Sequence, residues 1–337
     1  MNTRSKSILK TVTFRRAFNF FLLKSSYHLS YWVKRPIHWG TPMAVSIEPT
    51  TACNLRCPQC PSGLRQFTRP TGNLKKELNT QILDKLGKSL QHINYYFQGE
   101  PFINPNFLEL VKEARRRNIY VVTSTNAHFI SPETADKIID SGLSEIIISI
   151  DGTTQETYEK YRIEGSLDKV LEGTKNLLAA KKKRNVSFPL ITFQFLVVKY
   201  NEHQIPEIQK MASEFGADRL TLKTVQVYDF ENGNELIPSA EKFARYKKDK
   251  NGKLIIKNKF RNSCWRSWSS CVITWDGTAV PCCFDKDAKH ELGKLSKDDF
   301  KTIWRGAVNR NFQKQILKDR QQIDICKNCS EGSQVWI

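Results

Sequence analysis

The chain has 337 residues, of which 39% are hydrophobic and 11% aromatic; this composition excludes a disordered chain and allows an ample core. Its 53 Lys and Arg against 34 Asp and Glu give a formal charge of +19, so we expect anionic partners: nucleic acid, an anionic membrane, a phosphorylated substrate or an acidic electron donor. Nine Cys, an odd number, argue against a full disulfide framework and favour metal ligation in a reducing compartment, which predicts a cytoplasmic protein.

Residues 1–40 are predicted to form a basic amphipathic extension. They contain no acidic residue, and Phe14, Phe18 and Phe21 recur at helical spacing. The longest apolar run, 20–23, is far too short to span a bilayer, and the segment lacks the pattern of a signal peptide. We expect this helix to pack on the outside of the next domain. The alternative is a peripheral helix on an anionic membrane surface.

Three cysteines, Cys53, Cys57 and Cys60, directly follow the first predicted strand. Their C-x3-C-x2-C spacing is one thiolate short of a closed tetrahedral site, because no further cysteine occurs before Cys264. A 4Fe-4S cluster held by three protein thiolates leaves one iron open to a small molecule. The alternative is a structural zinc site that takes a distant fourth ligand.

Between residues 41 and 228, β-rich apolar runs alternate with amphipathic helical segments. This alternation predicts parallel strands joined by helical crossovers, and therefore an α/β domain. The predicted strands are 44–47, 93–97, 120–123, 145–150, 190–198 and 220–227. The predicted helices are 80–91, 106–117, 132–141, 167–183 and 205–215.

Short polar motifs follow three of these strands, where the functional groups of a barrel gather. Each motif alone is weak, since Asp-Gly usually marks only a turn. Their order along the chain, together with the cysteine loop, is what indicates one shared site. The candidate binding residues in these motifs and on the helix after the fourth strand are Gln98, Gly99, Glu100, Pro101, Asn126, Ser149, Asp151 and Arg162.

The cysteine spacing and the order of these motifs resemble the radical S-adenosylmethionine (SAM) superfamily. The resemblance implies a partial (β/α)6 barrel in which Cys53, Cys57 and Cys60 hold a 4Fe-4S cluster whose open iron binds SAM. In that family, reduction of the cluster cleaves SAM to methionine and a 5'-deoxyadenosyl radical. A low-potential flavodoxin or ferredoxin is the implied electron donor.

The same resemblance implies how SAM is held. Residues 98–101 are similar to a G-G-E-P motif that receives the SAM amino group, and 124–126 to a T-N-G segment. Residues 149–152 resemble an S-x-D-G motif whose hydroxyl and carboxylate bind a ribose. Arg162 stands where related enzymes use a guanidinium for the SAM carboxylate. The chain departs from the family pattern at Gln98 and Ala127, where glycines are usual, and at Gln59, where an aromatic residue is common.

Residues 229–262 interrupt the alternation and are rich in lysine. They are predicted to be a linker or a flap on the substrate side.

Residues 263–337 contain a second set of cysteines. Residues 272–281 predict a β-hairpin around Asp276-Gly277, and 300–304 a short helix. This layout resembles the SPASM/Twitch extension with one auxiliary cluster. The resemblance implies that a second 4Fe-4S cluster is held by Cys264, Cys282, Cys326 and Cys329, with Cys271 and Cys283 as alternates. A zinc ribbon is the other interpretation of these cysteines.

These observations predict a radical SAM enzyme that abstracts a hydrogen atom from its substrate. The expected substrate is a sugar, aminocyclitol or glycan-linked compound, and the positive charge suits an anionic one; an auxiliary cluster can accept the electron of an oxidation. The first alternative is a peptide- or protein-modifying maturase. The second alternative, of another functional class, is a non-catalytic metal-binding adaptor for RNA or membrane, in which lysines such as 181–183 contact phosphates. Nucleic acid is not the expected partner.

No catalytic acid or base can be assigned from the sequence. Glu100, Asp276 and Asp285 are candidates by residue type alone.

Overall fold

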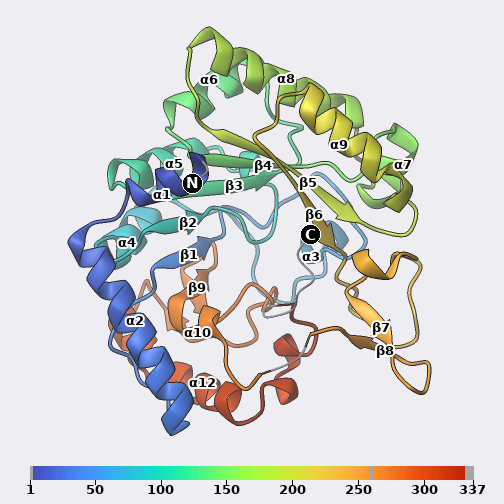
Figure 1. Cartoon of the computed structure of the whole chain (residues 1–337). Helices are drawn as coiled ribbons and strands as arrows, with labels where there is room; N and C mark the ends of the chain where they lie inside the picture. Colours follow the sequence, from blue (N-terminus) through green and yellow to red (C-terminus); the bar gives the residue numbers. More distant parts are fainter. Residues whose placement is uncertain (1–2, 259–260, 331–337) are drawn as a thin grey trace.

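The structure, a computed structural model, describes residues 3–258 and 261–330. Within them, nine strands form one sheet in the order β11-β10-β9-β1-β2-β3-β4-β5-β6. From β1 to β6, each strand runs parallel to its neighbour, as in the predicted partial (β/α)6 barrel (Figure 1). These strands are β1 Ala44–Ile47, β2 His92–Asn94, β3 Tyr120–Thr125, β4 Glu145–Ser149, β5 Leu190–Val197 and β6 Arg219–Thr224.

Helices connect these strands and cover the outer face of the curved sheet (Figure 1). Their apolar sides supply much of the main core, for example Ile82 and Leu83 against Val111. Side-chain caps begin several of them, such as Ser131, whose hydroxyl accepts the Thr134 N–H. They are α3 Pro61–Leu64, α4 Lys76–Leu86, η1 Pro101–Ile103, α5 Phe107–Arg116, α6 Pro132–Asp140, α7 Gln155–Tyr161, α8 Leu167–Lys183, η2 Glu202–Gln204 and α9 Ile205–Glu214.

The predicted elements of the barrel are present, with differences at their ends. The second strand stops at Asn94 rather than reaching 97, and the sixth stops at Thr224 rather than 227. The helix predicted at 80–91 is α4, Lys76–Leu86. The aromatic run 95–97 has strong β propensity. Only its first member continues the ladder, with the Tyr95 N–H donating to the Val122 carbonyl at 2.8 Å, whereas Tyr96 and Phe97 line a cavity.

The C-terminal residues extend the barrel sheet. Strands β9 Ser270–Ile273 and β10 Thr278–Val280 form the predicted hairpin, and β9 pairs in parallel with β1. The sequence did not predict this second pairing, which joins residues 44–47 to 270–273. The other elements here are α10 Trp265–Ser269, β11 Gly293–Lys294, α11 Phe300–Arg305, α12 Ala307–Asp319, η4 Arg320–Gln322 and η5 Asp324–Cys326.

The segment predicted as a linker contains ordered structure. Besides η3 Glu241–Phe243, it includes an antiparallel hairpin of β7 Tyr246–Lys248 and β8 Leu254–Ile256, at the lower right of Figure 1. The Tyr246 ring stacks on Phe230 with 4.4 Å between centroids, and its hydroxyl donates to the Val227 carbonyl at 3.1 Å. This hairpin is therefore packed against the end of the barrel.

The basic extension contains α1 Thr3–Leu9 and α2 Phe14–Val33. The inner side of α2 packs on the protein, as expected: the buried Arg16 guanidinium donates to the Asn118 carbonyl at 2.6 Å. Its Tyr27 ring meets Trp265 and Trp268 edge-on.

The outer side of α2 is apolar and exposed, with Phe14 88% and Trp32 75% accessible. Among the residues that the structure describes, no helix combines the length and apolar character that a bilayer crossing requires. Contact of this face with a membrane surface stays a prediction.

Candidate SAM and iron-sulfur sites

Cys53, Cys57 and Cys60 lie together in the loop that follows β1, in an apolar cluster with Leu55 and Val225. Cys57 is buried and the other two are half-buried. The pKa of Cys53 is raised to about 12, mainly by burial, with contributions in the same direction from the nearby Glu100 carboxylate and the other two thiols. The Cys53 and Cys57 thiols therefore stay protonated until a metal displaces their protons.

The arrangement of these thiols fits a cluster better than a single ion. Within residues 3–258 and 261–330, no three His, Cys, Asp or Glu side chains are close enough together to hold one metal ion. In a cubane each thiolate binds a different iron, so the sulfur atoms stand further apart than around one zinc ion. The loop supplies three thiols, the number that a cubane with one open iron needs.

The turn after β2 is built directly against the cysteine loop. Gly99 has a φ of +74°, and a Cβ there would lie 2.3 Å from the Thr50 carbonyl oxygen, so only glycine fits. Its N–H donates to Ser62 Oγ at 2.8 Å, and the Glu100 N–H donates to the Ala52 carbonyl at 2.7 Å. The preceding residue, Gln98, lies with its amide oxygen 3.8 Å from Cys60 Sγ.

The buried Glu100 carboxylate joins two loops of the predicted SAM site. It accepts hydrogen bonds from the Thr125 hydroxyl at 2.7 Å and the Asn126 N–H at 2.8 Å. Burial raises the pKa of Glu100 to about 7, although these donors oppose the shift. A carboxylate oxygen can accept more than one donor, so Glu100 keeps capacity for an ammonium group. The Asn126 side chain donates in turn to Asn54 Oδ1 at 2.8 Å, inside the cysteine loop.

Asp151 and Arg162 form an ion pair beside the first cysteine set. Arg162 Nε is 2.6 Å from one Asp151 oxygen, and the other oxygen accepts the Leu196 N–H at 2.7 Å. Arg162 Nη1 lies 3.7 Å from Cys57 Sγ. Burial lowers the pKa of Arg162, but Asp151 and Cys57 outweigh it and raise the value. The guanidinium is thus fixed to Asp151 by Nε, with Nη1 facing the cysteine loop. Ser149 is buried at the end of β4.

The four expected auxiliary ligands come together from distant parts of the chain. Arg320 lies among them, and its Nη2 donates to Cys329 Sγ at 3.1 Å. Burial lowers the pKa of Arg320, but Cys264, Cys329 and Cys326 outweigh this effect and raise it. Cys264 also raises the pKa of Cys282, after that thiol's contact with Cys283 and its burial. Cys264, Cys326 and Cys329 therefore lie around Arg320, and Cys264 links Cys282 to them, in the region where a four-thiolate cluster would be held.

The two alternate cysteines point elsewhere. Cys271 is in β9 within the main core, and burial alone raises its pKa to about 12, with no contribution from another thiol. Cys283 touches Cys282, but its sulfur accepts a hydrogen bond from Arg266 at 3.4 Å and lines a cavity. The geometry thus favours the four ligands named first, and their binding of a cluster stays a prediction.

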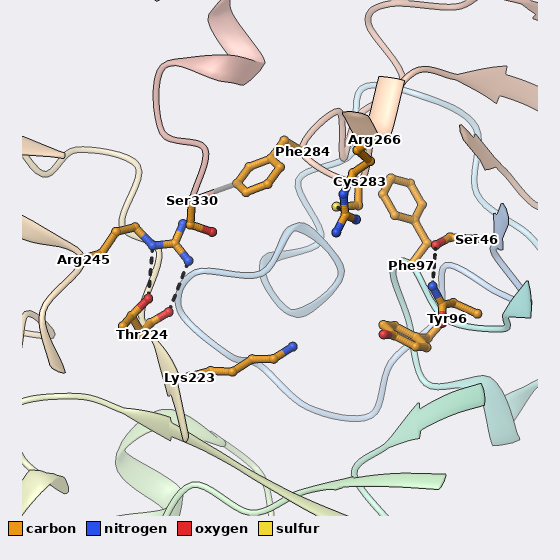
Figure 2. A pocket seen from close by; sticks show the side chains of 11 residues that line it. Ser46, Tyr96, Phe97, Lys223, Thr224, Arg245, Arg266, Cys283, Phe284 and Ser330 are labelled. Atoms are coloured by element: carbon orange, nitrogen blue, oxygen red, sulfur yellow. Dashed lines mark hydrogen bonds between the residues drawn. The ribbon is translucent and has the colours of Figure 1, made fainter. Parts of the chain in front are cut away.

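A cavity of about 250 Å³ lies where the C-terminal residues close the gap between the first and last barrel strands. Figure 2 shows Lys223 of β6 reaching toward its centre, with Arg266 and Cys283 at one side and Arg245 at the other. Its lining residues are Ser46, Asn94, Tyr96, Phe97, Lys223, Thr224, Arg245, Arg266, Cys283, Phe284 and Ser330.

Sequence reasoning missed the cations of this cavity. One signal was available, because Lys223 is a charged residue inside a β-rich apolar run, 220–227. Arg245 and Arg266 carry no such signal, since only the folded chain brings them to the same place.

Two of the three candidate carboxylates serve turns. Asp276, in the turn of the hairpin, pairs with Lys294 of β11 at 2.6 Å. The Asp285 carboxylate accepts the backbone N–H groups of Lys289 and His290. Glu100 alone among these three lies beside the cysteine loop.

Comparison with known proteins agrees with this geometry. A family model described as the radical SAM superfamily matches residues 47–212, and a SPASM model, described as an iron-sulfur cluster-binding domain, matches residues 264–330. Mycofactocin maturase MftC of Mycobacterium tuberculosis is 26% identical over 311 residues, which cover 86% of this chain and 75% of that protein. PqqA peptide cyclase of Bradyrhizobium diazoefficiens is 30% identical over 211 residues, covering 60% of this chain and 52% of that protein.

A solved structure shares the fold. SuiB of Streptococcus suis, determined with its precursor peptide SuiA, superposes with a TM-score of 0.61 at 14% identity, covering 93% of this chain and 75% of that one. The same protein bound to SAM gives 0.61, covering 87% and 73%.

The matched domains show that the protein is an enzyme with SAM and two 4Fe-4S clusters as cofactors. The order of the motifs along the barrel and the two converging cysteine sets lead to the same assignment. The chain belongs to the radical SAM superfamily and carries a C-terminal SPASM iron-sulfur cluster-binding domain.

Proposed function

We propose that this enzyme modifies a peptide or protein substrate. The observation that carries the proposal is the similarity to mycofactocin maturase MftC, which extends over 86% of the chain and therefore through both cysteine-bearing domains. PqqA peptide cyclase is a second relative whose name states a peptide substrate. These relatives support the peptide alternative better than the sugar or aminocyclitol substrate expected from the sequence.

Each cofactor has a set of residues that suits it. Cys53, Cys57 and Cys60 would hold the SAM-binding cluster, and Cys264, Cys282, Cys326 and Cys329 the auxiliary one. When bound, SAM and its cluster supply reductive cleavage and hydrogen-atom abstraction. The Glu100 carboxylate can accept the amino group of SAM, and the Arg162 guanidinium can pair with its carboxylate.

The cavity beside this site is where the reacting residue of the substrate would bind. Tyr96 and Phe97 line it and directly precede Gln98, so the cavity and the predicted SAM contacts share one stretch of backbone. The aromatic rings and the C-terminal residues Cys283 and Phe284 form part of its wall, and a bound substrate would complete the enclosure. Such enclosure holds a target C–H in place and keeps water away from reactive species.

The test is an anaerobic reaction of the reconstituted enzyme with SAM and a reductant. We would offer short peptides encoded next to its gene and, in parallel, phosphorylated sugars and aminocyclitols. We expect a mass change in a peptide, together with 5'-deoxyadenosine, and loss of both in Cys53→Ala. Modification of a sugar or aminocyclitol, with every peptide unchanged, would overturn the proposal.

Reduction of the cluster requires an electron donor. We propose a low-potential flavodoxin or ferredoxin, for which the formal charge of +19 offers an attractive surface. Reduction by flavodoxin that slows steeply as salt rises from low to physiological concentration would support electrostatic docking. A rate that does not change with salt would contradict it.

A further inference from the structure

Lys223 is a cation without a partner. Its ammonium has no hydrogen-bond acceptor and no ion pair among the residues that the structure describes, and it reaches into the cavity from β6 (Figure 2). Burial lowers the pKa of Lys223, and the Arg266 and Arg245 guanidinium groups lower it further, against the Cys283 thiol. A half-buried charge in such surroundings is costly unless something anionic joins it.

The rest of the cavity is also cationic. Among the described residues, Arg245 donates to neutral oxygens: the Thr224 hydroxyl at 3.4 Å, the Thr224 carbonyl at 3.3 Å and the Asn328 carbonyl at 3.2 Å. Arg266 adds a third positive side chain. Among the described residues, none that lines the cavity is acidic. The Asp151 carboxylate raises the pKa of Lys223 through the electrostatic field, but Asp151 is already paired with Arg162 at 2.6 Å.

We propose that this cavity binds a carboxylate of the peptide substrate, with Lys223 as its principal partner. The proposal rests on the peptide function proposed above and names the chemistry that selects the reacting residue. A volume of about 250 Å³ lies below the usual range for drug-sized ligands and suits a single residue. The Tyr96, Phe97 and Phe284 rings would contact its carbon atoms while the carboxylate meets the cations.

Two sources could supply this carboxylate: an acidic side chain or the C-terminus of the peptide. Either would remove the electrostatic cost of Lys223 and would place its neighbouring C–H groups beside the predicted SAM site.

Cys283 offers a reporter inside the cavity. In the reconstituted holoenzyme without SAM, we would alkylate with iodoacetate, which carries a carboxylate, and with iodoacetamide, which is neutral and similar in size. Mass mapping gives the rate at Cys283 for each reagent. Because both reagents attack the same thiolate, their rate ratio reports the preference of the cavity for a carboxylate and not the reactivity of the thiol.

We expect the iodoacetate to iodoacetamide ratio at Cys283 to exceed that of free cysteine and to fall about tenfold in Lys223→Gln, which corresponds to about 1.4 kcal/mol. Lys223→Arg should keep most of the preference. Lys199→Gln, at an exposed position beyond the end of β5, should not change it. Iron content identical to wild type shows that each variant is folded. A ratio equal to that of free cysteine, or no alkylation of Cys283, would overturn the proposal.

Protection experiments then separate the two sources. N-acetylalanine carries only a C-terminal carboxylate. N-acetylglutamate α-amide, in which the α-carboxyl group is blocked, carries only a side-chain carboxylate. N-acetylalanine methylamide is the neutral control. Slower iodoacetamide labelling with either acid identifies that source, and protection by neither acid contradicts the proposal. None of these measurements needs turnover, so failure to find a peptide product would leave this result standing.

Discussion

Arg69 holds Glu48 with two hydrogen bonds, of 2.6 and 2.9 Å, inside the protein. Glu48 is fully buried at the end of β1, Arg69 comes from the loop after the first cysteines, and the Trp275 N–H of the C-terminal hairpin also donates to Glu48, at 3.2 Å. Burial raises the pKa of Glu48, and Arg69 opposes this shift. One carboxylate therefore joins the barrel, the cysteine loop and the auxiliary domain.

Loss of this ion pair should be strongly destabilising. Arg69→Met leaves a buried carboxylate without its partner, which we expect to cost about 3–5 kcal/mol of unfolding free energy. Chemical denaturation of the reconstituted protein under anaerobic conditions measures it. Lys160→Met, which removes the partner of the fully exposed Glu156, is the matched control and should leave stability nearly unchanged. A similar decrease in unfolding free energy in both variants would contradict a particular role for the buried Arg69–Glu48 ion pair.

Gly99→Ala should damage the SAM site through a clash. The new Cβ would meet the Thr50 carbonyl oxygen at 2.3 Å, so the turn must move away from the cysteine loop. We expect SAM cleavage to fall at least about tenfold, an effect of about 1.4 kcal/mol on the barrier. Gly252→Ala is the control, because that glycine also has positive φ, +80°, but has no atom within 4 Å of the added Cβ. Gly252→Ala should lower stability by about 1–2 kcal/mol, through the left-handed backbone conformation alone, and should keep full activity.

The cysteines should divide into three groups when iron is counted. Wild type should hold about eight irons per chain, and Cys53→Ala and Cys282→Ala should each retain about four. Only the former should abolish SAM cleavage. Cys271→Ala should retain all the iron, because that thiol lies in the core of β9 away from both sets. Loss of iron in Cys271→Ala would assign this residue to a cluster after all.

Arg162→Lys should weaken SAM binding. Lysine keeps the charge but cannot hold Asp151 through one nitrogen and a carboxylate through two others. The loss of charge-assisted hydrogen bonds predicts an affinity about 10–100-fold lower, measured by equilibrium binding of SAM to the holoenzyme. Arg56→Lys, in the cysteine loop but paired with the exposed Glu164 at 3.4 Å, should bind SAM normally. Equal effects of both substitutions would point to loop disruption instead.

His38 should make the protein sensitive to mild acid. It packs between Trp268 and Trp304, and burial lowers its pKa to about 4, helped by the charges of Arg305 and Arg310. Since the unfolded state then binds more protons between pH 6.5 and 4, the contribution of neutral His38 is complete above pH 6.5 and is lost as pH falls through this interval. The loss reaches up to about 3 kcal/mol.

The measurement compares the unfolding of wild type with that of His38→Phe at a series of pH values. The stability difference should shift in favour of the variant as pH falls from 7 to 5. A difference that stays constant over this range would contradict the low pKa.

Much of the barrel could be predicted from the sequence because its signals are local. The helix Leu167–Lys183 and the strand Ala44–Ile47 have the boundaries that their periodicity indicates. The turn at Gly99 could be predicted for the same reason, because its motif is local. A short motif directly after a strand indicates both the conformation of the turn and its position at the end of the barrel where sites form.

Other features depend on residues far apart in the chain. No periodicity reveals that Ala44 pairs with Ser270, because the pairing partner of a strand is a property of the whole topology. The cationic cavity is similar: Arg245 and Arg266 carry no signal in the sequence, and they join Lys223 around one cavity only in the folded chain. Substrate selection was therefore the least predictable part of the site.

The pairing of β1 with β9 also sets an order of events during translation. When the barrel strands have left the ribosome, β1 still has an unpaired edge, because its second neighbour, 270–273, has not yet been made. The nascent chain must therefore keep an open strand next to its first cysteine loop while the following segments are synthesised. A ribosome that stalls before β9 would release a barrel with this edge uncovered, prone to aggregation however well its other strands had paired.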